Sequence, residues 1–419
     1  MSEKTPGRGS STPTPLAGGR LNGLDHLRAF AITYVVLNHY GTLFPHPRWV
    51  EGLGSFGWTG VDLFFTLSGY LMGGQLMRRL AQGQRVRARA FYLNRFFRII
   101  PAYWFTVAIY FTVPPAREFP LIPPLWKFLT FTQNLGFNPE LGHAFSHAWS
   151  LCVEEHFYLF LPVFLAFLGS GKMHGRRWSV SSVIFILVGG MVLRAVIWWK
   201  CVDHAYFPSW YEQIYCPTYD RLDGLLVGVS AAAFQIYVPT QWQSLTRRWP
   251  LLLAGSGFFL FAGYLLSTDR TSLVFTVIGF PTIATGYGLL LVAALSPGCF
   301  LHRTRLAVTN RVALWSYSLY LIHKVVVHVV QSECGQTGLD QSSTRVFVIS
   351  IVVSLFAAWI MYRLLERPFL VLRDALLGGD PCRPITPFWA ATAAARHECP
   401  LPGSVRRGLP MNPEADPGP

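Results

Sequence analysis

The sequence predicts an all-helical integral membrane protein with about ten transmembrane helices and both termini in the cytoplasm. Of its 419 residues, 52% are hydrophobic and 13% are charged, whereas a soluble domain carries about 25% charged residues. The apolar residues gather in repeated runs of about 17–25 residues, a length that crosses a bilayer as a helix. The formal net charge of +14 lies mostly in short loops between these runs. This placement is typical of membrane topology and argues against a nucleic-acid partner.

The apolar runs define the spans in order along the chain. The predicted spans cover residues 25–44, 58–77, 99–113, 148–168, 180–199, 218–237, 250–267, 272–295, 312–330 and 345–365. A Pro-rich stretch at 114–147, with the short amphipathic piece PLWKFLTFTQNL, separates the third span from the fourth. We expect residues 21–370 to form one transmembrane domain. The polar segment 1–20 and the Pro-, Gly- and Arg-rich cytoplasmic segment 371–419 are predicted to be disordered. Because residues 1–20 contain no apolar stretch, the first span is predicted to be a signal anchor.

Basic residues mark alternate loops. The loops after the second, fourth, sixth and eighth spans are rich in Arg and Lys, and the others are poor in them. Such loops remain on the cytoplasmic side, so the pattern orients a multi-pass protein of the plasma (inner) membrane. The basic residues are Arg78, Arg79, Arg85, Arg87, Arg89, Arg95, Arg98, Lys172, Arg176, Arg177, Arg247, Arg248, Arg303, Arg305 and Arg311.

The first span contains two polar residues that suggest a site. Arg28 and His39 are eleven residues apart, close to three helical turns. They therefore share a helix face and are separated by about 16 Å along its axis. Charged and titratable groups inside a membrane are costly and usually serve a function. On this topology Arg28 lies near the cytoplasmic face and His39 in the outer half.

Several carboxylates are predicted at a depth similar to that of His39. Together with this histidine they could form an acid–base cluster open to the outside. Glu154 and Glu155 are adjacent and cannot share a helix face, so we expect only one of them, preferably Glu154, to point into the site. The outer-half polar residues are Asp62, Glu154, Glu155, Asp220, Arg221 and Asp223.

Two arginines on the cytoplasmic side suggest a phosphate site. Arg95 and Arg98 are at i and i+3 immediately before the third span, with Pro101 inside its first turn. Paired guanidinium groups suit phosphate oxygens, although the positive-inside rule alone could also account for them. The distance between Arg28 and His39 is similar to that of an extended pantetheine arm, which suggests an acyl-CoA donor bound from the inside without establishing one.

Several motifs together resemble the acyltransferase 3 family of membrane-bound O-acyltransferases. The segment LDHLRAFAITYVVLNH resembles the family's LDGLRG…H pattern, and RFFRIIP matches its RxxRIxP motif. HAWSLCVEEHFYLFLP resembles its WSLxVEEQFY motif. The likeness also includes GVDLFFTLSGYL, YDRLDGLLVG, SYSLYLIH and ERP, and it covers roughly residues 21–370.

This resemblance implies an acyltransferase that moves groups other than amino-acyl groups. It implies transfer from cytoplasmic acyl-CoA, with acetyl-CoA or another short acyl-CoA expected, to a hydroxyl of an extracytoplasmic carbohydrate or related acceptor. His39 would be the catalytic base and Arg28 its companion. The resemblance implies Arg95 and Arg98 as the CoA-binding pair, and we also expect Ser68 at the donor site. The residues expected in an acceptor or structural polar cluster are Asp62, Tyr158, Asp220, Arg221, Asp223 and His323.

The sequence also departs from the family pattern. His26 and Ala29 replace glycines in the first motif, and His156 replaces the glutamine of WSLxVEEQFY. The changes in the first span should leave Arg28 and His39 on their shared helix face. The substitution at His156 leaves the polar contacts of the acceptor pocket unpredicted. We expect a single transmembrane module without an SGNH-type hydrolase domain.

Other interpretations stay open beside this one. The chain could be a transporter or flippase of a glycolipid or polysaccharide precursor with an intramembrane proton relay, or a non-catalytic scaffold. Direct transfer and transfer through an acylated His39 are both compatible with the sequence. His143 and His147 have a spacing that can bind zinc, but HAFSH lacks the Glu of HExxH and we expect no metal. A Cys201–Cys216 disulfide and a homodimer also remain open.

Overall fold

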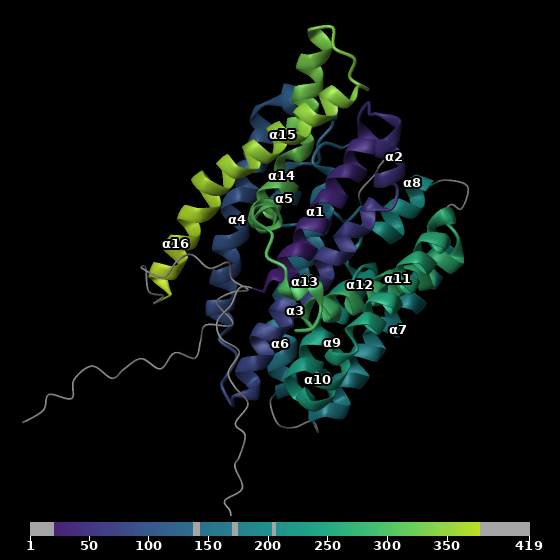
Figure 1. Cartoon of the computed structure of the whole chain (residues 1–419), viewed down its shortest axis with the longest axis vertical. Helices are drawn as coiled ribbons and strands as arrows, with labels where there is room; N and C mark the ends of the chain where they lie inside the picture. Colours follow the sequence, from purple (N-terminus) through teal and green to yellow (C-terminus); the bar gives the residue numbers. More distant parts are fainter. Residues whose placement is uncertain (1–20, 137–142, 170–174, 203–206, 378–419) are drawn as a thin grey trace, which may run out of the picture. The chain divides into compact units, whose positions relative to one another are not determined.

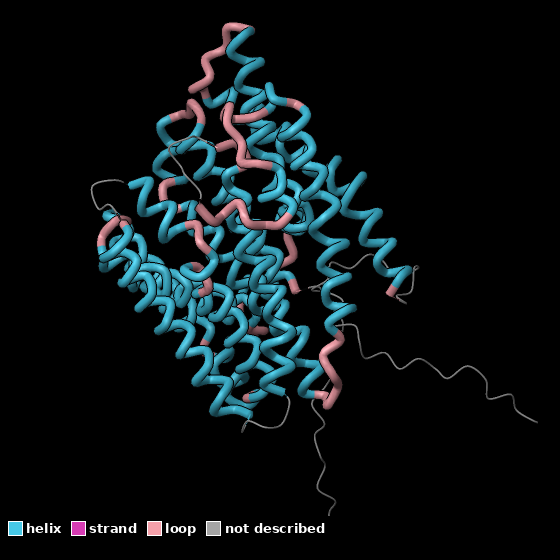
Figure 2. Tube along the Cα trace, turned by 180° about the vertical axis from the view of Figure 1, so that it is seen from behind, coloured by secondary structure: helices cyan, strands magenta, loops and turns pink. Residues whose placement is uncertain are grey.

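The computed structural model describes residues 21–136, 143–169, 175–202 and 207–377. This part of the chain is built from helices joined by loops (Figures 1 and 2). It contains no strand, only one isolated bridge between Leu121 and His143. The predicted all-helical fold class is therefore confirmed. The segments 1–20 and 378–419, Lys172, and the side chains of Arg176 and Arg177 lie outside the described residues.

A helix occupies each predicted span. The ten helices are α1 (Asn22–Leu43), α3 (Gly60–Ala81), α4 (Ala88–Thr112), α6 (Trp149–Gly169), α7 (Gly175–Cys201), α9 (Asp223–Tyr237), α11 (Trp249–Leu266), α12 (Phe280–Leu295), α14 (Ala307–Gln336) and α15 (Thr344–Met361). Within the described residues, six helical regions are long and apolar enough to cross a membrane, and they contain α6, α7, α11, α12, α14 and α15. Helix α9 is shorter, and α1, α3 and α4 carry charged residues. The count of ten spans and the side of each terminus stay predictions.

Short helices connect or extend these ten. They are α2 (Arg48–Gly54), α5 (Leu125–Leu129), α8 (Phe207–Trp210), α10 (Pro239–Arg247), α13 (Phe300–Arg303) and α16 (Arg367–Leu376). The predicted amphipathic piece of the Pro-rich stretch is only the short helix α5. A π-helical turn, Tyr362–Glu366, joins α15 to α16, which continues past the predicted domain boundary at residue 370. Helix α16 packs against α4 and buries Leu370 and Arg373.

Helix α4 differs from its prediction. It begins at Ala88 and contains Pro101 in its interior, so Arg95 and Arg98 lie within the helix rather than before it. Ala, Leu and Arg favour a helix in residues 88–98. Proline is tolerated inside membrane helices because neighbouring groups take up the freed backbone carbonyl.

Helix α1 lies among helices from distant parts of the sequence. Helix α1 packs against α14, α3 and α12 (Figure 1). The most extensive helix–helix contact is that of α3 with α9. A Cβ atom on Gly69 would lie 2.0 Å from the carbonyl oxygen of Leu225, and one on Gly228 would lie 2.1 Å from that of Thr66. The two backbones therefore approach each other at glycines, as membrane helices commonly do.

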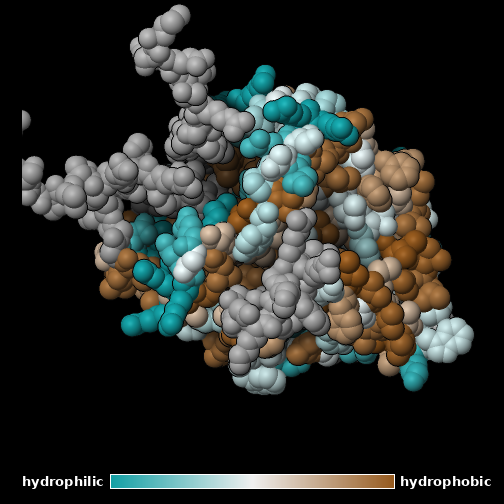
Figure 3. Space-filling model, turned by 90° about the horizontal axis from the view of Figure 1, so that it is seen from below, coloured by the Kyte–Doolittle hydropathy of each residue, from teal (hydrophilic) through white to brown (hydrophobic). Residues whose placement is uncertain are grey.

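Large apolar side chains cover much of the outer surface. Phe185 and Trp199 on α7 are 77% and 75% exposed, and Phe258 on α11 is 67% exposed. Figure 3 shows broad hydrophobic areas on the face that it presents. Exposed apolar surface of this extent is expected where lipid tails, rather than water, surround a protein.

Candidate active site

Helix α1 carries the two residues on which the predicted site depends. Buried Leu27, Ile32 and Val35 fix it in the bundle, whereas Arg28 and His39 remain partly exposed. Both lie within the helix Asn22–Leu43, so the predicted spacing of about 16 Å along one face holds. The polar groups around each end of this axis come from other helices.

Three histidine rings meet at the His39 end. Nδ1 of His39 lies 2.8 Å from Nε2 of His323 on α14, and the two rings are stacked with centroids 5.0 Å apart. The ring of His147, from the turn before α6, lies 5.7 Å from that of His39 and 5.0 Å from that of His323. His323 and His147 are buried. His39 is therefore the member of the trio that a substrate could reach.

A buried ion pair adjoins these rings. Lys324 follows His323 on α14, and its Nζ lies 3.4 Å from Oε1 of Glu118 and 2.8 Å from Oγ of Ser146. Oε1 of Glu118 also accepts the backbone N–H of Phe145 at 3.1 Å. Phe145 has a left-handed backbone, with φ of 59°. Glu118 thus holds together the turn that presents His147 and the cation beside His323.

Glu154 belongs to a different group, at the Arg28 end. Its Oε1 accepts the hydroxyl of Ser68 at 2.8 Å and its Oε2 that of Tyr158 at 3.1 Å. The guanidinium of Arg95 lies 4.6 Å from the centre of the Tyr158 ring. Arg95 and Arg28 are the cations that interact electrostatically with Glu154. Ser68, predicted at the donor site, and Tyr158 therefore meet around this carboxylate.

The predicted cluster of His39 with several carboxylates is not formed. The hydrogen bond of His39 goes to His323, and the charged group near its ring is Lys324. The hydropathy pattern predicted one depth for these residues, whereas Glu154 lies with Arg28 and Arg95 at the other end of α1. Glu155 interacts electrostatically with Arg95, as Glu154 does, and also with Tyr103 and Tyr317.

The predicted arginine pair is divided between two partners. Nη1 of Arg98 lies 2.8 Å from Oε2 of Glu366, the first residue of the ERP motif, and Glu366 also accepts the hydroxyl of Ser318. Arg95 instead lies beside Tyr158. Arg28 still interacts electrostatically with both Arg95 and Arg98, so the three guanidinium groups gather at one end of α1.

Of the remaining predicted polar residues, Asp62, Arg221 and Asp223 form ion pairs. Arg221 contacts Asp62 at 2.8 Å, and Arg194 on α7 donates to both oxygens of Asp223 at 2.6 and 3.1 Å. Arg194 also donates to the backbone oxygen of Asp220 at 2.7 Å. These contacts join α3, α7 and the start of α9. They favour the structural interpretation of this cluster over an acceptor site.

Three smaller features concern His156, two cysteines and the potential metal ligands. Nδ1 of His156 lies 2.7 Å from Oγ1 of Thr218, so the residue that replaces the family's glutamine contacts a loop rather than His39. Cys201 and Cys216 are both free thiols. Among the described residues, no group of three or more His, Cys, Asp or Glu side chains is arranged to hold a metal ion.

Four residues that the structure brings into these groups had no predicted place in the site. His147 had been considered only as a zinc ligand, although it opens the HAWSLCVEE motif. Lys324 and Arg194 are charges inside apolar spans, which by itself marks a candidate site. Glu118 had no local signal, because it lies in the Pro-rich stretch and reaches Lys324 only in the folded protein.

The fold and these groups define an integral membrane protein with a polar axis inside its helical bundle. This polar axis is helix α1, with Arg28 at one end and His39 at the other. The chain belongs to the acyltransferase family, whose profile, described as "Acyltransferase domain", matches residues 21–363. The family indicated by the motifs is therefore confirmed, and the chain is a membrane-protein member of this acyltransferase family.

Similar curated proteins support this assignment. The chain is 27% identical over 373 residues to O-acetyltransferase OatA of Staphylococcus aureus (strain NCTC 8325 / PS 47), with 83% of this chain and 57% of the relative covered. The same identity and coverage apply to O-acetyltransferase OatA of strain COL and of strain MRSA252. The chain thus spans little more than half the length of these relatives. No solved structure matches it.

Proposed function

We propose that this protein is an O-acyltransferase of the plasma membrane that uses cytoplasmic acyl-CoA, with an acetyl or another short acyl group. The acceptor is a hydroxyl of a carbohydrate-containing or related molecule on the extracytoplasmic side. The observation that carries this proposal is the polar axis along α1, with Arg28 among arginines at one end and His39 among histidines at the other. The relatives named as O-acetyltransferases support the choice of acetyl transfer.

The arginine end has the charge that a CoA donor requires. Arg28 interacts electrostatically with both Arg95 and Arg98, and like charges gathered in this way repel. A phosphate or pyrophosphate group relieves this repulsion and accepts charge-assisted hydrogen bonds from guanidinium groups. An extended pantetheine arm then leads along α1 toward His39 and carries the thioester to the histidine end.

The chemistry requires one base and one leaving group. His39 removes the proton of the acceptor hydroxyl while the oxygen attacks the thioester carbonyl carbon. The carbon–sulfur bond breaks, and the CoA thiolate leaves with the proton that His39 returns. In the covalent variant, His39 attacks the carbonyl carbon itself and carries the acyl group to the acceptor in a second step.

The proposal is tested by following a labelled acyl group from acyl-CoA to acceptor in membranes that contain the full chain. We expect His39→Ala to lower kcat by about 100-fold or more, the usual contribution of a general base. Arg95→Gln should raise the KM for acyl-CoA, since it removes one phosphate-binding cation. His328→Ala is the matched control, because it removes a histidine of α14 that lies outside both groups, and it should retain transfer.

Two outcomes would contradict the proposal. Normal transfer by a well-folded His39→Ala protein would exclude His39 as the base or the acyl carrier. Movement of a glycolipid across the membrane without consumption of acyl-CoA would favour the transporter interpretation. Kinetics separate the two chemical routes, because ping-pong behaviour accompanies the covalent one and direct transfer needs both substrates bound together.

A further inference from the structure

The hydrogen bonds of His323 define where its proton lies. Its Nδ1 lies 3.0 Å from the backbone oxygen of Leu319 and 2.9 Å from that of Tyr320. A carbonyl oxygen can only accept a hydrogen bond, so Nδ1 of His323 carries the hydrogen. In a neutral imidazole the other nitrogen is then an acceptor. Nε2 of His323 therefore presents a lone pair to its neighbour.

The charge next to His323 favours this neutral form. Lys324 is the adjacent residue, and its buried ammonium group pairs with Glu118 at 3.4 Å. A second positive charge on buried His323 would lie beside that cation, which is costly where water is excluded. His147 contributes a third ring to the cluster. The titratable groups around His39 are thus two other imidazoles and one cation that is already paired.

The state of His323 determines the state of His39. The two rings meet at 2.8 Å between Nε2 of His323 and Nδ1 of His39. Since Nε2 of His323 accepts, Nδ1 of His39 must be the donor. A neutral His39 then has its free lone pair on Nε2. Among the described residues, nothing forms a hydrogen bond with this nitrogen, and the side chain is partly exposed.

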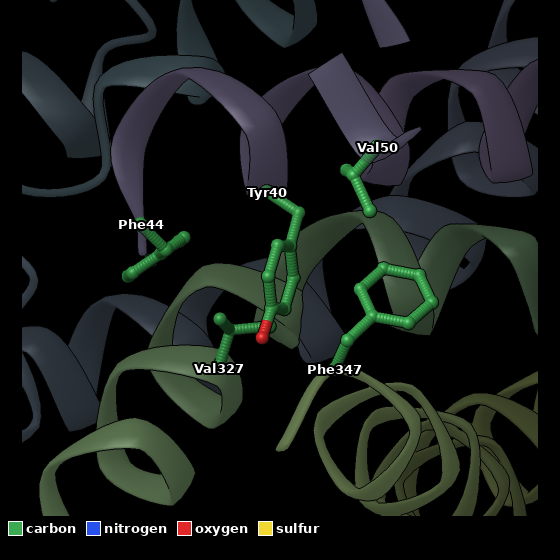
Figure 4. Close-up of a cluster of buried hydrophobic side chains, with 5 residues drawn as sticks. All are labelled: Tyr40, Phe44, Val50, Val327 and Phe347. Carbon is green, nitrogen blue, oxygen red and sulfur yellow. The ribbon is translucent and has the colours of Figure 1, made fainter. Parts of the chain in front are cut away.

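Packing next to the two rings holds α1 and α14 in one register. Tyr40, the residue after His39, is buried in a cluster with Phe44, Val50, Val327 and Phe347 (Figure 4). Gln331 donates hydrogen bonds of 2.8 Å to the hydroxyl of Tyr40 and of 2.8 Å to the backbone oxygen of Pro45. His323, Val327 and Gln331 are spaced by four residues, so one face of α14 meets α1. A slip of either helix would break the His39–His323 contact.

We propose that His323 is a positioning residue that fixes the tautomer of His39 and makes Nε2 of His39 the basic nitrogen. Two backbone carbonyls of α14 orient His323, and His323 orients His39. When Nε2 of His39 takes the proton of the acceptor hydroxyl, its Nδ1–H continues to donate to His323, which stabilises the imidazolium. The proton then leaves from Nε2 to the CoA thiolate. This inference rests on the proposed function of His39 as the base.

The first test is spectroscopic and does not depend on catalysis. The full chain, labelled with ¹⁵N-histidine and placed in lipid bilayers, is studied by solid-state NMR, and the His39 signals are identified by their loss in His39→Gln. We expect Nδ1 of His39 to be protonated and Nε2 to be unprotonated in the native protein and in His323→Gln, because the amide oxygen replaces the acceptor. His323→Phe should lose this preference. His147→Phe, which removes a neighbouring ring without removing the hydrogen bond, should keep it.

The second test separates positioning from packing by kinetics. We expect His323→Phe and the shorter His323→Asn to lower kcat by about 100-fold, since a misplaced tautomer removes the general base. The KM for acyl-CoA should not change, because the donor site lies at the other end of α1. His323→Gln should restore most of kcat.

The proposal is overturned if native His39 is protonated at Nε2, or if folded His323→Phe keeps both the tautomer and kcat. A folded His323→Gln protein as inactive as His323→Phe would also overturn it, because the ring rather than the acceptor would then be required. If His323→Phe does not fold, the native and His323→Gln spectra still decide. Full transfer by His39→Ala would refute the proposed role of His39, whereas the spectrum would still report its tautomer.

Discussion

The contact between α3 and α9 yields a quantitative prediction about Gly69→Ala. A Cβ atom at this position would lie 2.0 Å from the backbone oxygen of Leu225, whereas ordinary van der Waals contact begins at 3.4 Å. The helices must therefore separate by about 1.4 Å, because a backbone oxygen cannot turn aside as a flexible side chain can. Overpacking of this kind lowers the free energy of unfolding by about 1–3 kcal/mol. The higher helix propensity of alanine raises it by at most about 1 kcal/mol.

The same substitution should also affect the site. Ser68 precedes Gly69 and donates to Glu154 at 2.8 Å. A shift of α3 lengthens this hydrogen bond, so Gly69→Ala should reduce acyl transfer in the protein that remains folded. The effect on stability is measured by thermal unfolding of the full chain in detergent micelles.

Gly257→Ala is the matched control for this prediction. Gly257 lies in α11, and a Cβ atom there would meet no atom within 4 Å. This substitution should leave the unfolding temperature unchanged or raise it slightly, since only helix propensity changes. Equal unfolding temperatures for Gly69→Ala and Gly257→Ala would refute the close approach of α3 and α9.

Two further predictions concern contacts outside the His39 trio. Asp62→Asn leaves the buried guanidinium of Arg221 without its charged partner and should destabilise the protein by about 3–5 kcal/mol. Thermal unfolding measures this loss of stability. Arg221→Met combined with Asp62→Asn should partly restore the stability. An unchanged unfolding temperature in Asp62→Asn would show that the ion pair does not stabilise the protein. Cys201 is exposed and Cys216 is buried, so a thiol-specific maleimide should label Cys201 in the folded protein and Cys216 only after unfolding. A disulfide that protects both thiols from the reagent would contradict the structure.

The sequence by itself determined much of the fold, because its signals are local. Apolar runs of about 17–25 residues indicate membrane helices wherever they occur, and a helix occupies each predicted span. The placement of Arg28 and His39 on one face follows from the helical period alone. The motifs, read in order, also identified the family. Helix α4 was predicted too short, because an arginine-rich segment resembles a loop by hydropathy yet favours a helix by propensity.

Only the tertiary structure decided which polar groups meet. His39 and His323 are separated by 284 residues, and Arg98 and Glu366 by 268. Hydropathy gives each residue an approximate depth, but the partners depend on how each helix is rotated and on which helices are neighbours. Glu154 was predicted at the depth of His39, whereas its partners Ser68, Arg95 and Arg28 place it at the other end of α1. The hydrogen-bond chain from the carbonyls of α14 through His323 to His39 required the register of two packed helices, and no local pattern contains that register.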